Sequence, residues 1–247
     1  MTEFPLIVPD WPAPARVHAY STTRRGGVSQ GRYSGLNLGT RTGDSLSTVI
    51  DNREILRDVA KLPSEPVWLA QVHGRRVIEA TGPMVTPAEA DGAVTGCAGV
   101  VCAVLTADCL PVLLCNHDGT RVGVAHAGWR GLVAGVVEAA VAALGEEPDR
   151  IIAWLGPCIG QAAFEVGPEV PDALLASDPG CDAAIRPGRG DRSHVDLREA
   201  ARHRLAMAGV HDVSASDECT FSDAERFYSY RRDGECGRMA TLIWLEA

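Results

Sequence analysis

The chain has 247 residues, of which 46% are hydrophobic and 22% charged, and its formal net charge is −9 at pH 7. This composition is that of an ordinary globular protein and excludes a disordered or fibrous chain. An acidic surface repels polyanions, so we expect no nucleic-acid partner, and arginine pairs such as Arg24-Arg25 and Arg231-Arg232 favour a small phosphate-bearing or neutral metabolite.

The N-terminal segment, MTEFPLIVPDWPAP, has no basic stretch before an apolar core and therefore predicts no export signal. The longest apolar stretch, 92–114, is interrupted by Gly96, Gly99, Asp108 and Pro111, so it predicts buried strands and no membrane helix. Because no export signal is expected, the eight cysteines are interpreted as reduced thiols. We therefore expect a cytoplasmic protein.

The first part of the chain predicts strands, a loop and a helix. Residues 15–22 read as a strand, and the segment 24–43, rich in Gly, Ser and Asn, reads as a loop. Apolar residues recur at helical spacing over 45–60, which predicts a helix. Residues 67–72 and 76–80 are predicted strands on either side of His73-Gly74.

The rest of the chain is densest in β-strand signals. Strands are predicted at 100–105, 111–115, 121–126, 151–155 and 240–245. A helix is predicted over 132–144, ending at Gly145, and another over 196–208, with Asp196 as its cap and Glu199 in the capping-box position. Strands and helices do not alternate strictly, so we expect an α+β or layered α/β/α sandwich with a mixed sheet, as a single domain over 1–247.

Three short motifs each place a histidine or cysteine where an apolar strand meets a turn. They are QVHG at 71–74, TADCLP at 106–111 and AHAGWRG at 125–131. Strand ends converge at a sheet edge, so His73, Cys109 and His126 can point at one spot. Two imidazoles and a thiolate suit zinc, with copper as an alternative, and three protein ligands leave the open position of a catalytic site. On spacing alone, a packed cysteine and hydrogen-bonded histidines explain the residues at least as well.

Other residues have two readings each. Arg130, at the start of a predicted helix, either binds an anion or pairs with a carboxylate. Arg53 either clamps phosphate or is a solvated helix arginine, and the loop containing Arg24 either closes over a ligand or is simply solvated. Asp91 and Asp108 could serve as a general acid or base, orient a ligand histidine, or form structural turns.

The segment 219–232 also has two readings, because it contains several aromatic residues and arginines. These side chains either stack on a planar ring such as a purine or form aromatic core capped by arginines.

These segments together resemble one family, called laccase-like or multicopper polyphenol oxidase and later purine nucleoside phosphorylase, with some bacterial members called peptidoglycan editing factor. The resemblance runs from about residue 20 to the end of the chain. It rests on motifs in order: STTR at 21–24, GGVS at 26–29, LNLG at 36–39, GD at 43–44, NR at 52–53, QVH at 71–73, ADG at 90–92, TADC at 106–109, AHAGWRG at 125–131, GPCI at 156–159 and FYSYRR at 227–232. Phe164 departs from it, since Tyr is common there.

The resemblance implies an α/β/α sandwich and a zinc ion held by His73, Cys109 and His126. It implies phosphorolysis of adenosine, inosine, guanosine and methylthioadenosine to the base and ribose 1-phosphate, with adenosine deamination as a second activity. Arg53 matches a position expected to bind phosphate.

The resemblance also extends the set of candidate site residues. Asn37, Arg24 and Arg130 join Arg53 as expected substrate-binding residues. Asp108 joins the three metal ligands as a candidate acid for deamination. The expected partners are thus purine nucleosides and phosphate.

Three alternatives stay open at this stage. The first is copper-dependent phenol oxidation, against which the sequence weighs because only two of seven histidines fall in the metal motifs. The second is an amidase that edits cell-wall precursors, for which the same open metal site would serve. The third is a non-enzymatic zinc module, which needs a fourth protein ligand such as Cys158.

Overall fold

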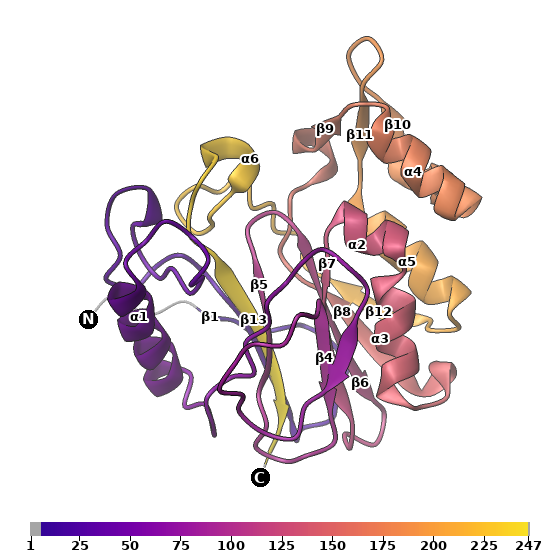
Figure 1. Ribbon diagram of the computed structural model, residues 1–247. Helices are drawn as coiled ribbons and strands as arrows, with labels where there is room; N and C mark the ends of the chain where they lie inside the picture. The colour runs from indigo at the N-terminus through magenta and orange to yellow at the C-terminus, as the bar shows by residue number, and fades with distance from the viewer. Residues whose placement is uncertain (1–5, 247) are drawn as a thin grey trace.

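The structure is a computed structural model that describes residues 6–246; residues 1–5, part of the segment examined for an export signal, and residue 247 lie outside it. Two larger sheets face each other, and helices cover both outer sides (Figure 1). The first sheet has the order β1 (Leu6–Ile7), β2 (Val17–Thr22), β13 (Met239–Leu245) and β5 (Cys102–Thr106). The second has the order β12 (Asp212–Ala215), β8 (Ile151–Leu155), β6 (Leu110–Asn116), β7 (Val122–Ala127), β4 (Gly92–Thr95) and β3 (Val77–Glu79).

The helices and a small third sheet complete the fold. One outer side carries α1 (Leu46–Val59), and the other carries α2 (Trp129–Ala134), α3 (Val136–Leu144) and α5 (Leu197–Met207) (Figure 1). Beyond α2 lie α4 (Glu169–Ser177) and the sheet of β10 (Ile185–Pro187), β11 (Ser193–Val195) and β9 (Glu165–Val166). The short α6 (Tyr230–Asp233) precedes β13. Short 3-10 turns span Gly31–Tyr33, Pro148–Arg150, Gln161–Ala163 and Pro179–Ala184.

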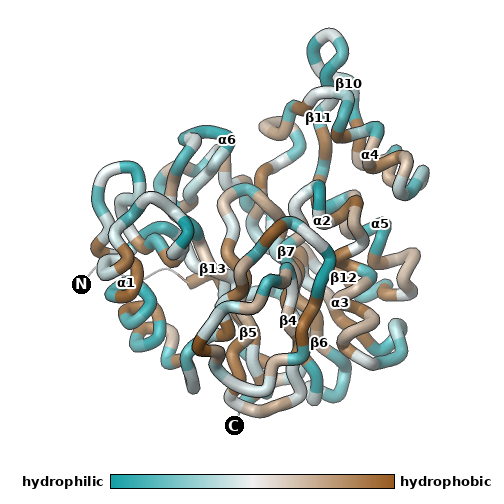
Figure 2. Tube along the Cα trace, in the orientation of Figure 1, coloured by the Kyte–Doolittle hydropathy of each residue, from teal (hydrophilic) through white to brown (hydrophobic). Residues whose placement is uncertain are grey.

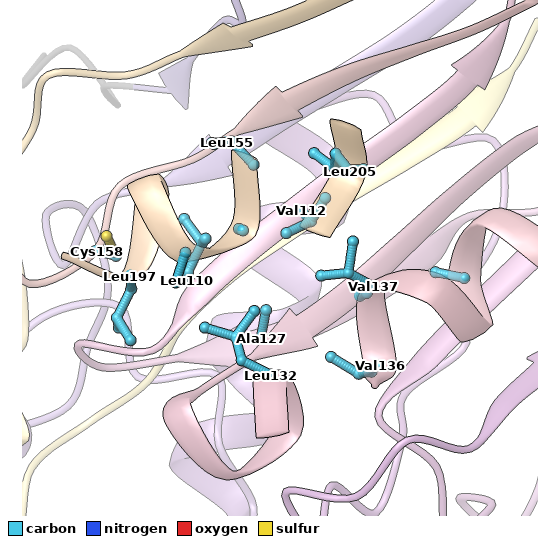
Figure 3. Packing of buried hydrophobic residues seen from close by; sticks show 14 of the residues in the cluster. Leu110, Val112, Ala127, Leu132, Val136, Val137, Leu155, Cys158, Leu197 and Leu205 are labelled. Carbon is cyan, nitrogen blue, oxygen red and sulfur yellow. The ribbon is translucent and has the colours of Figure 1, made fainter. Parts of the chain in front are cut away.

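The alternation of side chains along β6 explains why two cores form. Leu110, Val112 and Leu114 pack against the helices, whereas Leu113 and Cys115 pack between the two sheets. Figure 3 shows Leu110 and Val112 among apolar side chains of α3 and α5. A third cluster joins α1 to the outer face of the first sheet. Brown segments gather on the central strands in Figure 2, and teal segments lie on the periphery. The expected mixed α/β layering is therefore confirmed, with two sheets forming its β layer.

Most of the predicted elements are present, with two differences. Val67 makes only an isolated bridge with Cys102, so the strand predicted over 67–72 is not there. The helix predicted over 132–144 is two helices, because Gly135 takes a left-handed conformation (φ 87°) between α2 and α3. The cap at Asp196 is confirmed: its carboxylate accepts the backbone N–H groups of Arg198 and Glu199. Over residues 6–246, no helix is long and apolar enough to cross a bilayer.

Candidate metal centre and its pocket

The three residues of the predicted triad meet at one end of the second sheet. Cys109 lies in the turn between β5 and β6, and His126 lies in β7, where it pairs in register with Pro111 of β6. His73 comes from the loop before β3. Their donor atoms all lie within 4.8 Å of one another, and Cys109 Sγ is 3.9 Å from His73 Nε2. The expectation that these side chains converge is confirmed by this geometry.

The donor set and the space around it fit a small transition-metal ion. Zinc binds nitrogen at about 2.0–2.1 Å and sulfur at about 2.3 Å, so one ion can reach all three atoms after small side-chain rotations. A Cβ at Gly128 would lie 2.8 Å from Cys109 Sγ and 3.3 Å from His73 Cδ2, so the backbone closes tightly over the ligands. Within residues 6–246, the cluster contains three ligands and not Cys158, which leaves one tetrahedral position for water or substrate.

Asp91 forms hydrogen bonds with both candidate ligand histidines, His73 and His126. This carboxylate, fully buried at the start of β4, accepts the backbone N–H groups of Val72, His73 and Gly74 at 3.2, 2.9 and 2.7 Å. It also accepts Nδ1–H of His126 at 2.9 Å, which leaves Nε2 of that ring to face the metal position. The three backbone bonds hold His73 in a left-handed conformation (φ 61°) that non-glycine residues seldom adopt. The Asp91 carboxylate therefore positions His126 by binding the imidazole ring, and it positions His73 by binding the backbone N–H groups of that loop.

The histidines also prepare Cys109 to act as a thiolate. Burial by itself would raise the pKa of this thiol, but the charge and hydrogen bond of His126, together with those of His73, bring the pKa down to about 6. The pKa of His126 is raised in turn: burial opposes its charged form, but the Cys109 thiolate and Asp91 favour it more. Because thiolate is the form that binds metals, Cys109 is ready to act as a ligand near neutral pH.

The cluster forms part of the wall of a cavity of about 690 Å³, within the range of sites for small molecules. The wall combines apolar and aromatic side chains with several arginines. The lining includes Arg41, Arg53, Trp68, Gln71, Leu105, Asp108, Trp129, Arg130, Ile159, Phe164, Leu197, Tyr230, Arg231 and Arg238. A pocket of this kind can hold a flat, partly apolar molecule that also carries negative charge.

Arg53 lies in the wall of this pocket. Its Nε and Nη2 groups donate to the carbonyl oxygen of Leu38 at 3.0 and 2.8 Å, and its guanidinium stacks over Trp68 at 3.9 Å. Burial lowers its pKa to about 10, so it remains charged at neutral pH. No hydrogen bond from Nη1 is found within the described residues. The reading of Arg53 as a solvated helix arginine is therefore wrong.

Arg41 and Arg238 lie around the same loop. Arg41 belongs to the 39–42 segment, and a Cβ at Gly39 would lie 2.8 Å from Cγ of Arg238. Within residues 6–246, neither of them nor Arg53 forms an ion pair with a carboxylate. These three residues, which we call the arginine group, make one side of the pocket cationic.

Two residues expected to bind substrate do not line the pocket. Arg24 donates to the carbonyl oxygens of Ser34 and Ala224 and stacks on Tyr228. Asn37 is fully buried, and its amide holds the loop from Gly39 to Asp44. Both residues stabilise loops around the site, and they are placed there by contacts that a motif match cannot reveal. Arg130 does line the pocket, with its guanidinium 4.3 Å from the ring centroid of Trp129.

Asp108 lines the pocket next to the ligand Cys109, but its oxygens are already engaged. They accept Thr220 Oγ1 at 2.6 Å, Ser229 Oγ at 3.0 Å and the backbone N–H of Arg231 at 2.7 Å. Its backbone, like that of His73, is left-handed (φ 88°). Asp108 thus ties the C-terminal segment, which carries Tyr230 and Arg231 into the pocket, to the turn that carries Cys109.

Sequence reasoning missed several residues of the pocket. No sequence motif marks Arg238 as a pocket residue. It reaches the pocket because the loop containing Gly39 packs against it, just before β13. Gln71 was noted only as part of a motif. Its amide donates to the carbonyl oxygen of Leu105 and accepts that residue's N–H, which fixes the His73 loop to β5.

Comparison with known proteins identifies the family of the chain. Residues 18–246 match the family described as multi-copper polyphenol oxidoreductase laccase, and the chain belongs to that family. The chain is 51% identical over 240 residues to purine nucleoside phosphorylase YfiH of Escherichia coli (strain K12), covering 97% of this chain and 98% of that protein. It is 49% identical over 241 residues to a purine nucleoside phosphorylase of Pseudomonas aeruginosa, with 97% and 98% coverage.

Solved structures show the same fold. The Neisseria meningitidis protein NMB0706 superposes with a TM-score of 0.94 at 45% identity, covering 98% of this chain and 99% of that chain. YlmD of Geobacillus stearothermophilus superposes with a TM-score of 0.88 at 30% identity, covering 98% and 100%. The expected family is therefore confirmed, and both of these curated relatives carry the name purine nucleoside phosphorylase.

Proposed function

We propose that this chain is a zinc-dependent purine nucleoside phosphorylase that converts adenosine, inosine, guanosine and methylthioadenosine, with phosphate, to the base and ribose 1-phosphate. The observation that carries the proposal is one pocket whose wall contains both the His73–Cys109–His126 cluster and the arginine group. Relatives at about half identity carry the name purine nucleoside phosphorylase, which agrees with it. Adenosine deamination is proposed as a second activity at the same site.

Phosphorolysis requires phosphate to be held against C1′ of the ribose while the purine departs. In this proposal Arg53 binds phosphate through Nη1, which makes no hydrogen bond within residues 6–246, while its other two donors and Trp68 hold the guanidinium still. Arg41 and Arg238 add positive charge around the same anion. Zinc held by His73, Cys109 and His126 would supply Lewis-acid chemistry.

Asp108 receives a revised role in this proposal. Its carboxylate already accepts hydrogen bonds from the hydroxyls of Thr220 and Ser229 and from the backbone N–H of Arg231. We therefore assign it to holding the C-terminal wall of the pocket and to accepting a hydrogen bond from the substrate. The proton donor for deamination has no assigned residue.

The alternatives differ in the donors they need. Oxidases with several coppers use imidazole-rich centres, whereas residues 6–246 contain one His-Cys-His cluster. A structural zinc site would require a fourth ligand, and Cys158 is not part of the cluster. The editing amidase uses the same open site and is distinguished only by its substrate.

The test is to measure bound metal in the purified protein and to incubate it with adenosine or inosine, with and without phosphate. Ribose 1-phosphate that appears only with phosphate supports the proposal. Phenol oxidation that follows copper loading, without nucleoside turnover, would favour the oxidase, and amide hydrolysis without nucleoside turnover would favour the amidase. We expect Cys109→Ala to abolish turnover, while Cys97→Ala, at an exposed cysteine outside the pocket, retains it.

The phosphate position is tested separately. Replacing Arg53 by Ala should raise KM for phosphate by about ten-fold or more, because a charge-assisted contact of about 1.5–3 kcal/mol is lost, and should change KM for inosine less. Arg57→Ala is the matched control, since Arg57 lies one turn further along α1, is exposed and does not line the pocket. An unchanged KM for phosphate in Arg53→Ala would remove Arg53 from the proposal.

A further inference from the structure

Cys158 and Cys219 lie opposite each other just behind the metal centre. Strands β8 and β12 pair in parallel, and after they end the two chain segments meet again at a parallel bridge that places Cys158 against Cys219. The backbone N–H of Thr220 donates to the carbonyl oxygen of Cys158 at 3.0 Å, which holds the segments together. Both cysteines are reduced in the structure.

The pairing places the two thiols within reach of a covalent bond. Neighbouring strands lie about 4.7–4.9 Å apart, and paired residues project to the same side. Disulfides join residues whose Cα atoms are about 4.4–6.8 Å apart. We therefore expect rotation of the Cys219 side chain, with a small shift of the two segments, to bring the sulfur atoms together.

The two thiols differ in a way that separates an attacking from a resolving cysteine. Cys219 is partly exposed, and its Sγ accepts the backbone N–H of Gly160 at 3.2 Å and the hydroxyl of Ser222 at 3.3 Å. Burial opposes its ionisation, but these bonds and the backbone N–H groups of Phe221 and Ser222 lower its pKa. Cys158 is fully buried, and burial raises its pKa to about 12, so it remains a protonated thiol.

The charges around Cys219 select the kind of oxidant. The surface depression that contains Cys219 is also lined by the acidic residues Asp217, Glu218, Asp223 and Glu225. Arg226 pairs with Glu218 and Asp223, and Arg25 pairs with Glu225, so the acidic groups are only partly neutralised. Anionic oxidants are disfavoured there, whereas a neutral peroxide can approach the thiolate.

We propose that Cys219 is a peroxide-sensitive modification site and that Cys158 resolves its oxidised form as a reversible disulfide. The Cys219 thiolate attacks one oxygen of hydrogen peroxide, the O–O bond breaks, and, after uptake of one proton, water leaves and Cys219 becomes a sulfenic acid. The Cys158 thiol then attacks that sulfur, and the hydroxyl group leaves as a second water molecule with the Cys158 proton. Two electrons pass from the cysteine pair to the peroxide.

The Cys158–Cys219 disulfide would alter the metal pocket, because each cysteine is next in sequence to a residue that contacts Asp108. Ile159, next to Cys158, donates its N–H to the carbonyl oxygen of Asp108 at 3.0 Å and lines the pocket. Thr220, next to Cys219, donates its hydroxyl to the Asp108 carboxylate. Oxidation also removes the sulfur that accepts the Gly160 N–H, so the 158–160 turn shifts against the turn that carries Cys109.

The chemical test uses the metal-loaded, reduced protein and one to a few equivalents of hydrogen peroxide. We expect a mass loss of about 2 Da and, in a non-reducing digest, a peptide that joins Cys158 to Cys219 and separates on adding dithiothreitol. Iodoacetamide, which is neutral, should block the crosslink at lower concentration than anionic iodoacetate. Sulfenic, sulfinic or sulfonic acid at Cys219 without a crosslink, or a crosslink that joins other cysteines, would overturn the proposal.

Variants assign the two roles. Cys219→Ser should form neither crosslink nor sulfenic acid at this site, whereas Cys158→Ala should accumulate a Cys219 sulfenic acid that dimedone traps. Cys97→Ser is the control, because Cys97 is exposed and unpaired with either residue, and it should crosslink like the wild type. The wild-type digest decides the question even if a variant does not fold. Dimedone labelling of the double variant Cys158→Ala, Cys219→Ser equal to that of Cys158→Ala would assign the reactive thiol elsewhere.

The functional readout is made on the same samples. Crosslinked protein should lose about ten-fold or more of its nucleoside turnover and regain it with dithiothreitol, since small misplacements at a site have effects of that size. Metal released to a chromogenic chelator distinguishes this loss from oxidation of Cys109, and we expect no release at the peroxide level that forms the crosslink. Turnover unaffected by a complete crosslink would overturn the link to the pocket. The crosslink itself does not depend on which reaction the pocket performs.

Discussion

Replacing Asp91 by Asn is the sharpest test of how the metal centre is built. The wild-type carboxylate is fully buried and accepts four hydrogen bonds, three from the His73 loop and one from His126. An asparagine oxygen can accept about two of these, and its NH₂ group would face N–H donors. Each buried donor left without an acceptor costs about 1–3 kcal/mol, so two of them should lower the free energy of unfolding by about 2–6 kcal/mol.

Asp91→Asn should also lower the affinity of the protein for zinc. Loss of a carboxylate partner of a ligand histidine commonly weakens metal affinity by about 10–100-fold, and here the same change also releases the His73 loop. The assay is zinc competition with a chromogenic chelator, combined with urea unfolding in the presence and absence of zinc.

A matched control separates metal positioning from stability alone. Asp196→Asn also alters a carboxylate that accepts two backbone N–H groups, but at the start of α5, so it should change stability slightly and leave metal affinity unchanged. Wild-type zinc affinity in a folded Asp91→Asn protein would refute the reasoning.

Three further predictions follow from the same geometry. Gly128→Ala should weaken zinc binding by about ten-fold or more because its Cβ would lie 2.8 Å from Cys109 Sγ, while Gly82→Ala, with open space around it, should not; equal affinities in a chelator competition would contradict this. Asp108→Asn should cost about 1–3 kcal/mol in urea unfolding and lower kcat without removing a limb of the pH–rate profile, since a missing limb would mark Asp108 as the proton donor instead. Chelation of zinc supplied at about 100 times its Kd should remove about 2.7 kcal/mol and lower Tm by about 5–10 °C in a thermal scan, whereas an unchanged Tm would argue against a bound metal.

Local patterns predicted much of the secondary structure. The helix at 46–59, the run of strands from 102 to 127 and the cap at Asp196 follow from periodicity and capping, which depend on near neighbours in the chain. The strand predicted over 67–72 is absent because Asp91 and Leu105 hold that segment through contacts 19 and 34 residues away in sequence. The single helix predicted over 132–144 is interrupted at Gly135, whose left-handed backbone ends α2. The sequence pattern does not reveal this break, because the Ala and Val residues around Gly135 continue the apolar helical pattern.

The site divides in the same way. The sequence by itself made His73, Cys109 and His126 candidate ligands, because each lies in a motif at a strand end. Family resemblance then favoured the metal reading and brought Arg53 forward. Only the tertiary structure showed that Asp91 holds both histidines, that Arg24 and Asn37 lie outside the pocket, and that Arg41 and Arg238 lie inside it.

The physical reason is that a ligand's chemistry belongs to its own side chain, whereas a positioning contact depends on two segments meeting. Asp91 reaches the His73 loop across 17–19 residues of sequence, and Asp108 reaches the C-terminal segment across more than a hundred. Likewise, nothing in the sequence predicts that Cys158 and Cys219 lie together. The parallel approach of the segments after β8 and β12 is what places them side by side.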